Sequence, residues 1–197
     1  MAYIVDDDDA IRDALLWLFK SRNVPAQAWP SAEAFLADYT DDMAGCLLLD
    51  IRMAGMTGIE LFEQLQVRHS RLPVIFLTGH GDVPMAVATL KRGAHDFIEK
   101  PFDDNELVDR VVAALQLDAR QRSERANQAS VEAKLQQLTV REREVMERIL
   151  AGKLNKVIAD ELGIAVRTVE VHRARLFEKM GVRSAVELAQ LVATHRA

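Results

Sequence analysis

The residues with the most obvious chemistry are acidic and stand where two apolar runs end. Asp6 opens a row of four aspartates that continues through Asp7 and Asp8 to Asp9, and Asp50 follows the apolar run of residues 46–49. Carboxylates in front of a helix can cap its first amides, and one or two would satisfy that role. Several acids gathered beside Asp50 would repel one another, and a hard divalent cation such as Mg²⁺, which prefers oxygen ligands, would offset this repulsion. We therefore expect a metal site, with helix capping alone as the alternative.

A hydroxyl and an ammonium group belong to the same predicted region. Thr78, followed by Gly79, ends one apolar run, and Lys100 follows another. Pro101 restricts Lys100 to an extended conformation. Phosphoryl transfer to a carboxylate needs positive charges that neutralise the phosphoryl oxygens and a hydroxyl that bonds one of them. The pattern therefore predicts Asp50 as the phosphoacceptor, assisted by Thr78 and Lys100.

These side chains require a sheet whose strands end at one edge, and residues 1–118 have the pattern for it. Short apolar runs alternate with amphipathic stretches, which indicates parallel strands joined by crossover helices, and such sheets bind ligands at the carboxyl ends of their strands. We predict an α/β, doubly wound, five-stranded parallel sheet followed by an all-α domain. The expected strands are Tyr3–Asp6, Ala26–Trp29, Cys46–Asp50, Val74–Thr78 and Phe97–Glu99, and the expected helices are Ala10–Ser21, Ser31–Asp38, Gly58–His69, Val83–Arg92 and Glu106–Leu117.

The remainder of the chain is polar at first and then helical throughout. Residues 119–137 are rich in Gln, Arg and Glu. This composition indicates a solvated helical connector that can continue the preceding helix, with a disordered linker as the alternative. We divide the chain into a first domain at 1–118, a linker at 119–137 and a second domain at 138–197. The helices of the second domain are expected at Arg141–Ala151, Lys156–Leu162, Val169–Met180 and Ala185–Thr194.

The two domains carry opposite net charges, in a chain of 197 residues with a net charge of −5. Residues 1–118 contain 20 acidic and 10 basic side chains, whereas residues 119–197 contain 10 and 15. A basic domain suits a partner rich in phosphates, such as double-stranded DNA, and an acidic one does not. The sequence shows neither a signal peptide nor an apolar run of membrane-spanning length, so we expect a cytoplasmic protein with no membrane partner.

Two helical patterns joined at Gly163 have the form of a helix-turn-helix, in which the second helix enters the major groove of DNA. A small bundle that binds protein has the same spacing and is the alternative. On the second helix, Val169, Leu176 and Met180 fall on one face, which we expect to be buried. His172 stands at the margin of this face, where we expect a packed, hydrogen-bonded histidine.

The opposite face of the second helix presents Val171 and Ala174, together with Arg175 and Glu178. Small apolar side chains exposed on a helix suit contact with thymine methyl groups, and Glu170 at the edge of this face could accept a hydrogen bond from cytosine. Basic side chains around it could hold phosphates. We expect about half of these cations to reach DNA. The predicted DNA-contacting residues are Lys153, Asn155, Lys156, Arg167, Thr168, Glu170, Val171, Arg173, Ala174, Arg175 and Lys179.

Taken together, five separated elements of the first domain resemble the receiver domain of bacterial response regulators, across essentially all of residues 1–118. They are Val5-Asp6-Asp7-Asp8, Leu49-Asp50-Ile51-Arg52-Met53, Gly58, Thr78-Gly79 and Lys100-Pro101-Phe102. The resemblance implies a flavodoxin-like fold and phosphorylation of Asp50 by a sensor histidine kinase. One departure is Ala54, where the family usually has proline; this would loosen the loop without removing any chemistry.

The resemblance also assigns the metal ligands. It implies that Mg²⁺ is bound directly by Asp7, Asp50 and the main-chain carbonyl of Arg52. Asp6 would act through water.

A switch and a dimer surface follow from the same resemblance. Phe97 stands at the family's aromatic switch position, where the ring turns inward as Thr78 moves toward the phosphate; an ordinary core aromatic is the alternative. Phosphorylation would then favour a homodimer formed through Met85–Arg92 and Ala94–Ile98.

The second domain resembles the LuxR-type DNA-binding domain over residues 138–197. The similarity runs from Leu138-Thr-Val-Arg-Glu-Arg-Glu-Val to Thr168-Val-Glu-Val-His172. With the receiver ahead of it, the architecture is similar to the FixJ/NarL class, which implies a phosphorylation-dependent regulator of transcription. Two alternatives remain: a DNA-binding regulator independent of phosphorylation, and a Mg²⁺-dependent aspartyl-phosphate phosphatase. Such phosphatases commonly need a second acid where Arg52 stands, so we do not expect an enzyme.

Overall fold

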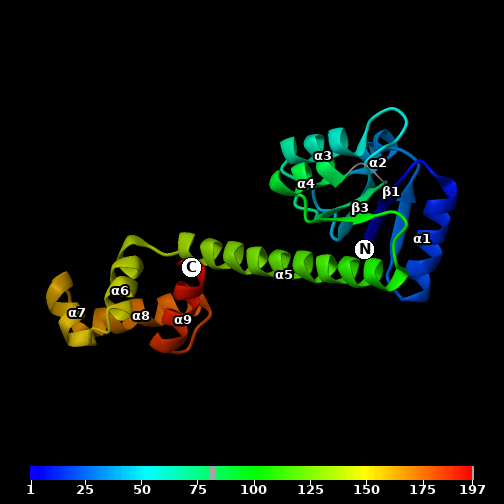
Figure 1. The fold of residues 1–197 in the computed structure, drawn as a ribbon. Helices are drawn as coiled ribbons and strands as arrows, with labels where there is room; N and C mark the ends of the chain where they lie inside the picture. Colours follow the sequence, from blue (N-terminus) through cyan, green and yellow to red (C-terminus); the bar gives the residue numbers. More distant parts are fainter. Residues whose placement is uncertain (80–82, 197) are drawn as a thin grey trace. The chain divides into compact units, whose positions relative to one another are not determined.

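The computed structural model describes residues 1–79 and 83–196, which form two compact units, Met1–Arg122 and Ser123–Ala197 (Figure 1). Ala197, the last residue of the predicted second domain, lies outside the described residues. Helix α5 (Asp104–Gln136) is continuous over 33 residues and contributes to both units. The polar connector is therefore helical and continues the preceding helix.

The first unit is a five-stranded parallel sheet in the order β2-β1-β3-β4-β5, which confirms the doubly wound fold. Val5 pairs with Leu49, and Asp50 pairs with Leu77, so the carboxyl ends of the central strands are level. The strands are β1 (Ala2–Val5), β2 (Ala26–Trp29), β3 (Cys46–Asp50), β4 (Val74–Thr78) and β5 (Asp96–Glu99), and the helices between them are α1 (Asp9–Ser21), α2 (Ala32–Asp38), α3 (Gly58–Val67) and α4 (Val83–Lys91).

Alternate residues of the central strands enter two separate hydrophobic cores. Ile4 and Leu48 face α1 and the first part of α5, whereas Val5 and Leu49 face α2 and α3. Because successive side chains of a strand point to opposite faces, a sheet covered on both sides must be apolar at every position. This explains why β1, β3 and β4 are buried at every residue, including Asp50 and Thr78 at their ends.

Three helix starts are capped by side chains. Thr57 at α3 and Thr139 at α6 form reciprocal capping boxes with the glutamates three residues later. Asp103 accepts hydrogen bonds from the amides of Asn105 and Glu106, so α5 begins at Asp104, two residues before the predicted start. The caps at Thr57 and Asp103 fix where the chain leaves the loops at the sheet edge.

The second unit is helical and closes around its own core. It contains α6 (Val140–Leu150), α7 (Asn155–Leu162), α8 (Val166–Met180) and α9 (Ala185–Arg196). Gly163 and Gly181 end α7 and α8 with left-handed φ values of 64° and 68°, which glycine adopts without strain. Helix α8 begins three residues earlier than predicted, because Ala165 supplies the first helical carbonyl without a side-chain cap to mark it.

Among the described residues, no helix combines the length and apolarity needed to cross a membrane.

Candidate functional site

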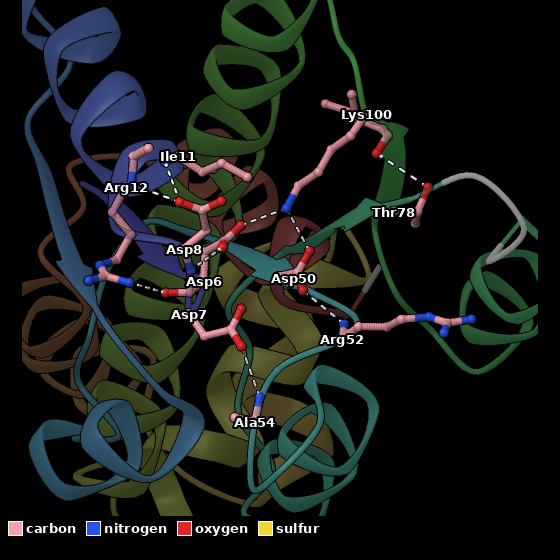
Figure 2. A network of polar contacts seen from close by, with 12 residues as sticks. Asp6, Asp7, Asp8, Ile11, Arg12, Asp50, Arg52, Ala54, Thr78 and Lys100 are labelled. Carbon is pink, nitrogen blue, oxygen red and sulfur yellow. Dashed lines mark hydrogen bonds and ion pairs between the residues drawn. The ribbon is translucent and has the colours of Figure 1, made fainter.

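Three charged side chains from three strand ends meet at the carboxyl edge of the sheet (Figure 2). Asp6 follows β1, Asp50 closes β3, and Lys100 follows β5. The Lys100 ammonium donates to Asp6 Oδ2 and to Asp50 Oδ1, at 2.7 Å in each case. Asp6 is 1% exposed and Asp50 7%. The predicted acceptor and its predicted lysine partner are thus in direct contact and nearly buried.

Two carboxylates share this one lysine, and the pKa shifts of Asp50 and Lys100 reflect it. Burial raises the pKa of the Asp50 carboxyl, and the charge of Asp6 acts in the same direction, whereas Lys100 opposes both. Burial alone would lower the pKa of Lys100, but its hydrogen bonds to Asp50 and Asp6 outweigh burial and raise it. The cluster of three therefore has one negative charge too many, and a cation in this site would relieve it.

Thr78 lies at the same edge but its hydroxyl is directed to the backbone. The residue is fully buried, and its hydroxyl donates to the carbonyl of Ile98 over 3.5 Å, a long and weak bond. The Thr78 carbonyl accepts a bond of 2.7 Å from the Lys100 amide, which ties the ends of β4 and β5 together. The Lys100–Pro101 peptide bond is cis, a feature that the sequence did not indicate.

Among the aspartates of the row Asp6–Asp9, some take each of the two predicted roles, helix capping and formation of the site. Asp8 caps α1 by accepting from the amides of Ala10 and Ile11, and Asp6 enters the cluster with Lys100. Asp7 turns away and accepts from the amide of Ala54 at 3.0 Å, as Figure 2 shows. Helix capping and site formation are thus both present in this row.

Arg12 supports the row from α1. Its guanidinium donates to the main-chain carbonyl of Asp6 at 2.7 Å and also contacts Asp9. Sequence analysis did not single out Arg12, although its place one turn into the helix that follows the acids could have suggested this contact.

The chemistry of the donors fits a hard divalent cation. Asp6, Asp7, Asp50 and the Arg52 carbonyl offer oxygen atoms at one sheet edge, and the buried excess of negative charge favours a cation. Across residues 1–79 and 83–196, however, no three acidic, imidazole or thiol groups are gathered in the manner of a metal site. For Asp7 to become a ligand, its carboxylate would have to leave the Ala54 amide.

Phe97 of β5 is half-buried and packs against the core on the α2–α3 side of the sheet. This position fits an ordinary core aromatic and also fits the predicted aromatic switch. The switch stays a prediction.

In the second unit, α8 presents the two faces that its sequence predicted. Val169, Leu176 and Met180 are fully buried, whereas Val171 is 43% exposed and Ala174 is exposed beside it. Arg175, Glu178 and Glu170 are also exposed. An apolar spot therefore lies in the middle of a polar helix face.

The predicted DNA-contacting cations differ in how far they are engaged within the domain. Lys179 is bound to Glu142 at 2.7 Å and to the Gln137 carbonyl at 3.2 Å, and Arg173 donates to Asn155 at 3.2 Å. Lys153 pairs with Glu161, and Arg167 lies 3.8 Å from Glu170. Thr168, Arg175 and Lys156 are exposed, and among the described residues no ion pair is recorded for the latter two.

Two residues of this domain make contacts that differ from those that the sequence predicted or that it did not predict. His172 is packed as predicted, but its Nδ1 atom is buried without a hydrogen-bond partner among the described residues, so the predicted hydrogen bond is wrong at that atom. Glu142 forms the capping box of α6 with Thr139, and it also holds Lys179. Burial would raise the pKa of Glu142, but Lys179 and Thr139 outweigh burial and lower it.

Comparisons with known proteins assign a family to each unit. Residues 2–112 match the response regulator receiver domain, and residues 136–192 match the bacterial regulatory proteins of the luxR family. The chain is 47% identical to the C4-dicarboxylate transport transcriptional regulatory protein DctR of Rhodobacter capsulatus, over 96% of this chain and 97% of that protein. It is 42% identical to the transcriptional regulatory protein FixJ of Bradyrhizobium diazoefficiens, over 96% and 92% of the two chains.

Solved structures give the same result. The response regulator StyR superposes with a TM-score of 0.90 at 42% identity, over 98% of this chain and 97% of that one. Full-length FixJ from B. japonicum superposes with a TM-score of 0.63 at 39% identity, over 99% and 96%. Both similarities span the two units.

Proposed function

Since this chain is a response regulator of the FixJ/NarL class that regulates transcription, with a receiver domain and a LuxR-type DNA-binding domain, we propose that phosphorylation of Asp50 controls its binding to DNA. The observation that carries the proposal is the buried contact of Lys100 with both Asp6 and Asp50. An acceptor carboxylate is held there beside a fixed positive charge.

The chemistry follows from these contacts. A carboxylate oxygen of Asp50 attacks the phosphorus of a phosphohistidine on the partner sensor kinase; the new P–O bond replaces the P–N bond, whose electron pair stays with the imidazole. Lys100, already 2.7 Å from Asp50, neutralises charge on the phosphoryl oxygens, and Thr78 donates its hydroxyl to one of them. The Thr78 hydroxyl is available for this because its present bond is long.

Mg²⁺ is the cofactor that the site would hold. It would supply positive charge toward the phosphoryl oxygens during transfer. Asp7, Asp50 and the Arg52 carbonyl would bind it directly, with Asp6 acting through water.

The phosphorylated receiver would act through its α4 and β5 region. Thr78 moves toward the phosphate, Phe97 turns inward, and two receivers pair through Met85–Arg92 and Ala94–Ile98. Two observations support this surface: β5 is an edge strand, and Met85 and Val87 on α4 are 37% and 41% exposed. Pairing brings two α8 helices to half-sites about one DNA turn apart.

DNA recognition would centre on the exposed face of α8. Val171 and Ala174 contact thymine methyl groups, and Glu170 accepts from cytosine. Basic residues around them hold the phosphates of the DNA. The protein would act in the cytoplasm, where the DNA is.

The test uses the full chain with Mg²⁺ and acetyl phosphate, followed by intact mass and sedimentation. We expect one added phosphoryl group, lost in Asp50→Ala, together with a shift from monomer to dimer and tighter DNA binding. Equal mass and equal DNA affinity with and without acetyl phosphate would reject the regulatory account. Sustained phosphate release with many turnovers would instead indicate a phosphatase, although this chain has Arg52 where such phosphatases commonly need a second acid.

A further inference from the structure

Apart from the amide of Thr57, which donates to Glu60 in the capping box of α3, the loop from β3 to α3, residues 51–57, is held by carboxylates from three different segments of the chain. The amide of Arg52 donates to Asp50 at 2.9 Å and the amide of Ala54 to Asp7 at 3.0 Å. The amide of Met56 donates to Glu33 Oε1 at 2.9 Å. Every second amide of the loop therefore has a carboxylate acceptor, and charge-assisted bonds of this kind are among the stronger ones in proteins.

Two of these three carboxylates have another task under the proposed function. Asp50 receives the phosphoryl group, and Asp7 turns from the Ala54 amide to bind Mg²⁺. Their hydrogen bonds to the loop change at the moment when the Arg52 carbonyl must be correctly placed for the metal. The capping box at Thr57 holds only the end of the loop at α3, so the part that follows Arg52 needs a further anchor that does not take part in the chemistry.

Glu33 has this property. It belongs to the first turn of α2, outside the row of site aspartates, and its side chain is exposed. Its carboxyl accepts hydrogen bonds from its own amide, from Met56 and from the Ser31 hydroxyl, and these bonds lower its pKa and keep it ionised. Glu33 is neither the acceptor nor one of the proposed metal ligands, so its bond to the Met56 amide can persist while Asp7 and Asp50 change partners.

Gly55 provides a second, independent sign that this contact is built into the fold. Its φ of +78° disfavours any other residue, and a Cβ there would lie 2.9 Å from Glu33 Oε1. The left-handed φ is the stronger constraint at this position, since the Glu33 carboxylate is the end of a flexible side chain that could shift away from a Cβ.

The departure at Ala54 makes the anchor more important in this chain. Proline, usual at this position in the family, would fix its own φ and would have no N–H for Asp7 to accept. With alanine, the loop loses that rigidity and depends on hydrogen bonds instead.

We propose that Glu33 is a positioning residue of the phosphorylation site: by accepting the Met56 amide it keeps the loop, and with it the Arg52 carbonyl, in place for Mg²⁺ while Asp7 and Asp50 change partners. The inference rests on the proposed function at Asp50. Glu33 itself does not touch the metal or the phosphoryl group.

The test compares the full-length wild type with Glu33→Ala and Glu33→Gln. Backbone NMR gives hydrogen exchange at the Met56 amide without Mg²⁺, and titration with MgCl₂, followed at the loop amides, gives the Mg²⁺ affinity. For Glu33→Ala we expect exchange at Met56 to rise and Mg²⁺ affinity to fall, each about three- to tenfold, the range for losing one hydrogen bond. Glu33→Gln keeps an oxygen acceptor and should recover most of both losses.

Phosphorylation by acetyl phosphate separates positioning from chemistry. In Glu33→Ala the Mg²⁺ concentration for half-maximal rate should rise in proportion to the lost affinity, while the rate at saturating Mg²⁺ stays close to that of the wild type. Glu63→Gln is the matched control, since it removes a glutamate charge from α3 whose partner is Arg92 and not the loop. Exchange at the Leu48 amide in β3 reports whether a variant is merely less stable.

Three results would overturn the inference. The first is a Glu33→Ala variant whose Met56 exchange and Mg²⁺ affinity equal those of the wild type. The second is a Glu33→Gln variant whose Mg²⁺ affinity is as low as that of Glu33→Ala, which would indicate that the charge matters and not the hydrogen bond. The third is an equal loss in Glu63→Gln. If the wild type takes up no phosphoryl group while the Met56 and Mg²⁺ effects persist, the proposed function fails and the positioning of the loop for the metal stands.

Discussion

The two domains each contain a buried charge cluster, and the clusters differ in balance. In the receiver, Asp6 and Asp50 share Lys100, so one negative charge is left over. In the DNA-binding domain, Glu142 meets Lys179 one to one. The pKa of Asp50 is accordingly raised, mainly by burial, whereas Lys179 and Thr139 lower the pKa of Glu142 against the effect of burial.

This difference separates a reactive cluster from a structural one. An unbalanced buried cluster gains stability from a further ion, and in the receiver that ion would be Mg²⁺, after which Asp50 can accept an anionic phosphoryl group. A balanced pair gains nothing from further ions, and Glu142 with Lys179 instead joins the start of α6 to the end of α8. The charges that we propose for DNA binding are instead exposed, on α8 and at the start of α7.

The largest expected effect is the loss of Lys100. In Lys100→Met two buried carboxylates face each other without a cation, so we expect the receiver to lose about 3 kcal/mol of stability at neutral pH. Phosphorylation by acetyl phosphate should slow on the order of 100-fold, the usual cost of removing one charge-stabilising group. Urea unfolding followed by tryptophan fluorescence reports the receiver alone, because both tryptophans, Trp17 and Trp29, lie in it. Wild-type stability would mean that the lysine is not the balancing charge.

The next effect concerns the balanced pair. Removing either partner, in Glu142→Gln or Lys179→Met, should cost about 1–2 kcal/mol, because each leaves a partly buried charge or donor without its partner. The double variant should lose less than the sum of the two, as coupled residues do. Thermal unfolding followed by far-UV circular dichroism measures all three. Strictly additive losses would show that the pair is not coupled.

The same pair predicts a pH dependence whose sign is fixed. The pKa of Glu142 is lowered from 4.5 in the folded state, so the folded domain holds its proton less tightly than the unfolded chain. The stability contributed by this group is complete above pH 4.5 and is lost as pH falls through the lowered pKa. Glu142→Gln should lack this acid-induced loss, which unfolding measurements in acidic buffers would show.

The sequence predicted the sheet edge better than the individual contacts within it. Periodicity placed Asp6, Asp50 and Lys100 at strand ends, and parallel strands must bring such residues together. Which aspartate of the row caps α1 and which joins Lys100 depends on the rotamer of each side chain, and the sequence pattern does not record rotamers. For the same reason the turn of Asp7 toward Ala54 was not predicted.

The sequence also did not predict contacts between residues that lie far apart in the chain. In the second domain, the sequence predicted the buried face of α8 from Val169, Leu176 and Met180, because these residues follow helical spacing. Lys179 was predicted to contact DNA phosphates, because a lysine near an exposed helix face is usually solvated and therefore free to bind them. Its partner Glu142 lies 37 residues earlier, and no local pattern links the two.

A smaller effect of opposite sign is expected at the acceptor itself. The folded receiver raises the pKa of Asp50, so the charged carboxylate costs stability at neutral pH, and the cost is relieved as pH falls through that raised pKa. In Asp50→Asn the charge is gone and Lys100 keeps Asp6, so the cluster becomes balanced. We expect a gain of about 1 kcal/mol at neutral pH, shrinking in acid. A loss of stability would show that Asp50 was already compensated by Lys100.

The smallest effect distinguishes a lysine that binds DNA from one that does not. Lys156 is exposed at the start of α7, and among the described residues no ion pair is recorded for it, whereas Lys179 is committed to Glu142. Lys156→Met should leave unfolding unchanged but reduce the salt dependence of DNA binding by about one unit of slope, because one phosphate contact is lost. Lys179→Met should weaken folding while the slope stays the same. DNA titrations at several salt concentrations with both variants decide this, and a reduced slope in Lys179→Met would place that ammonium on a phosphate after all.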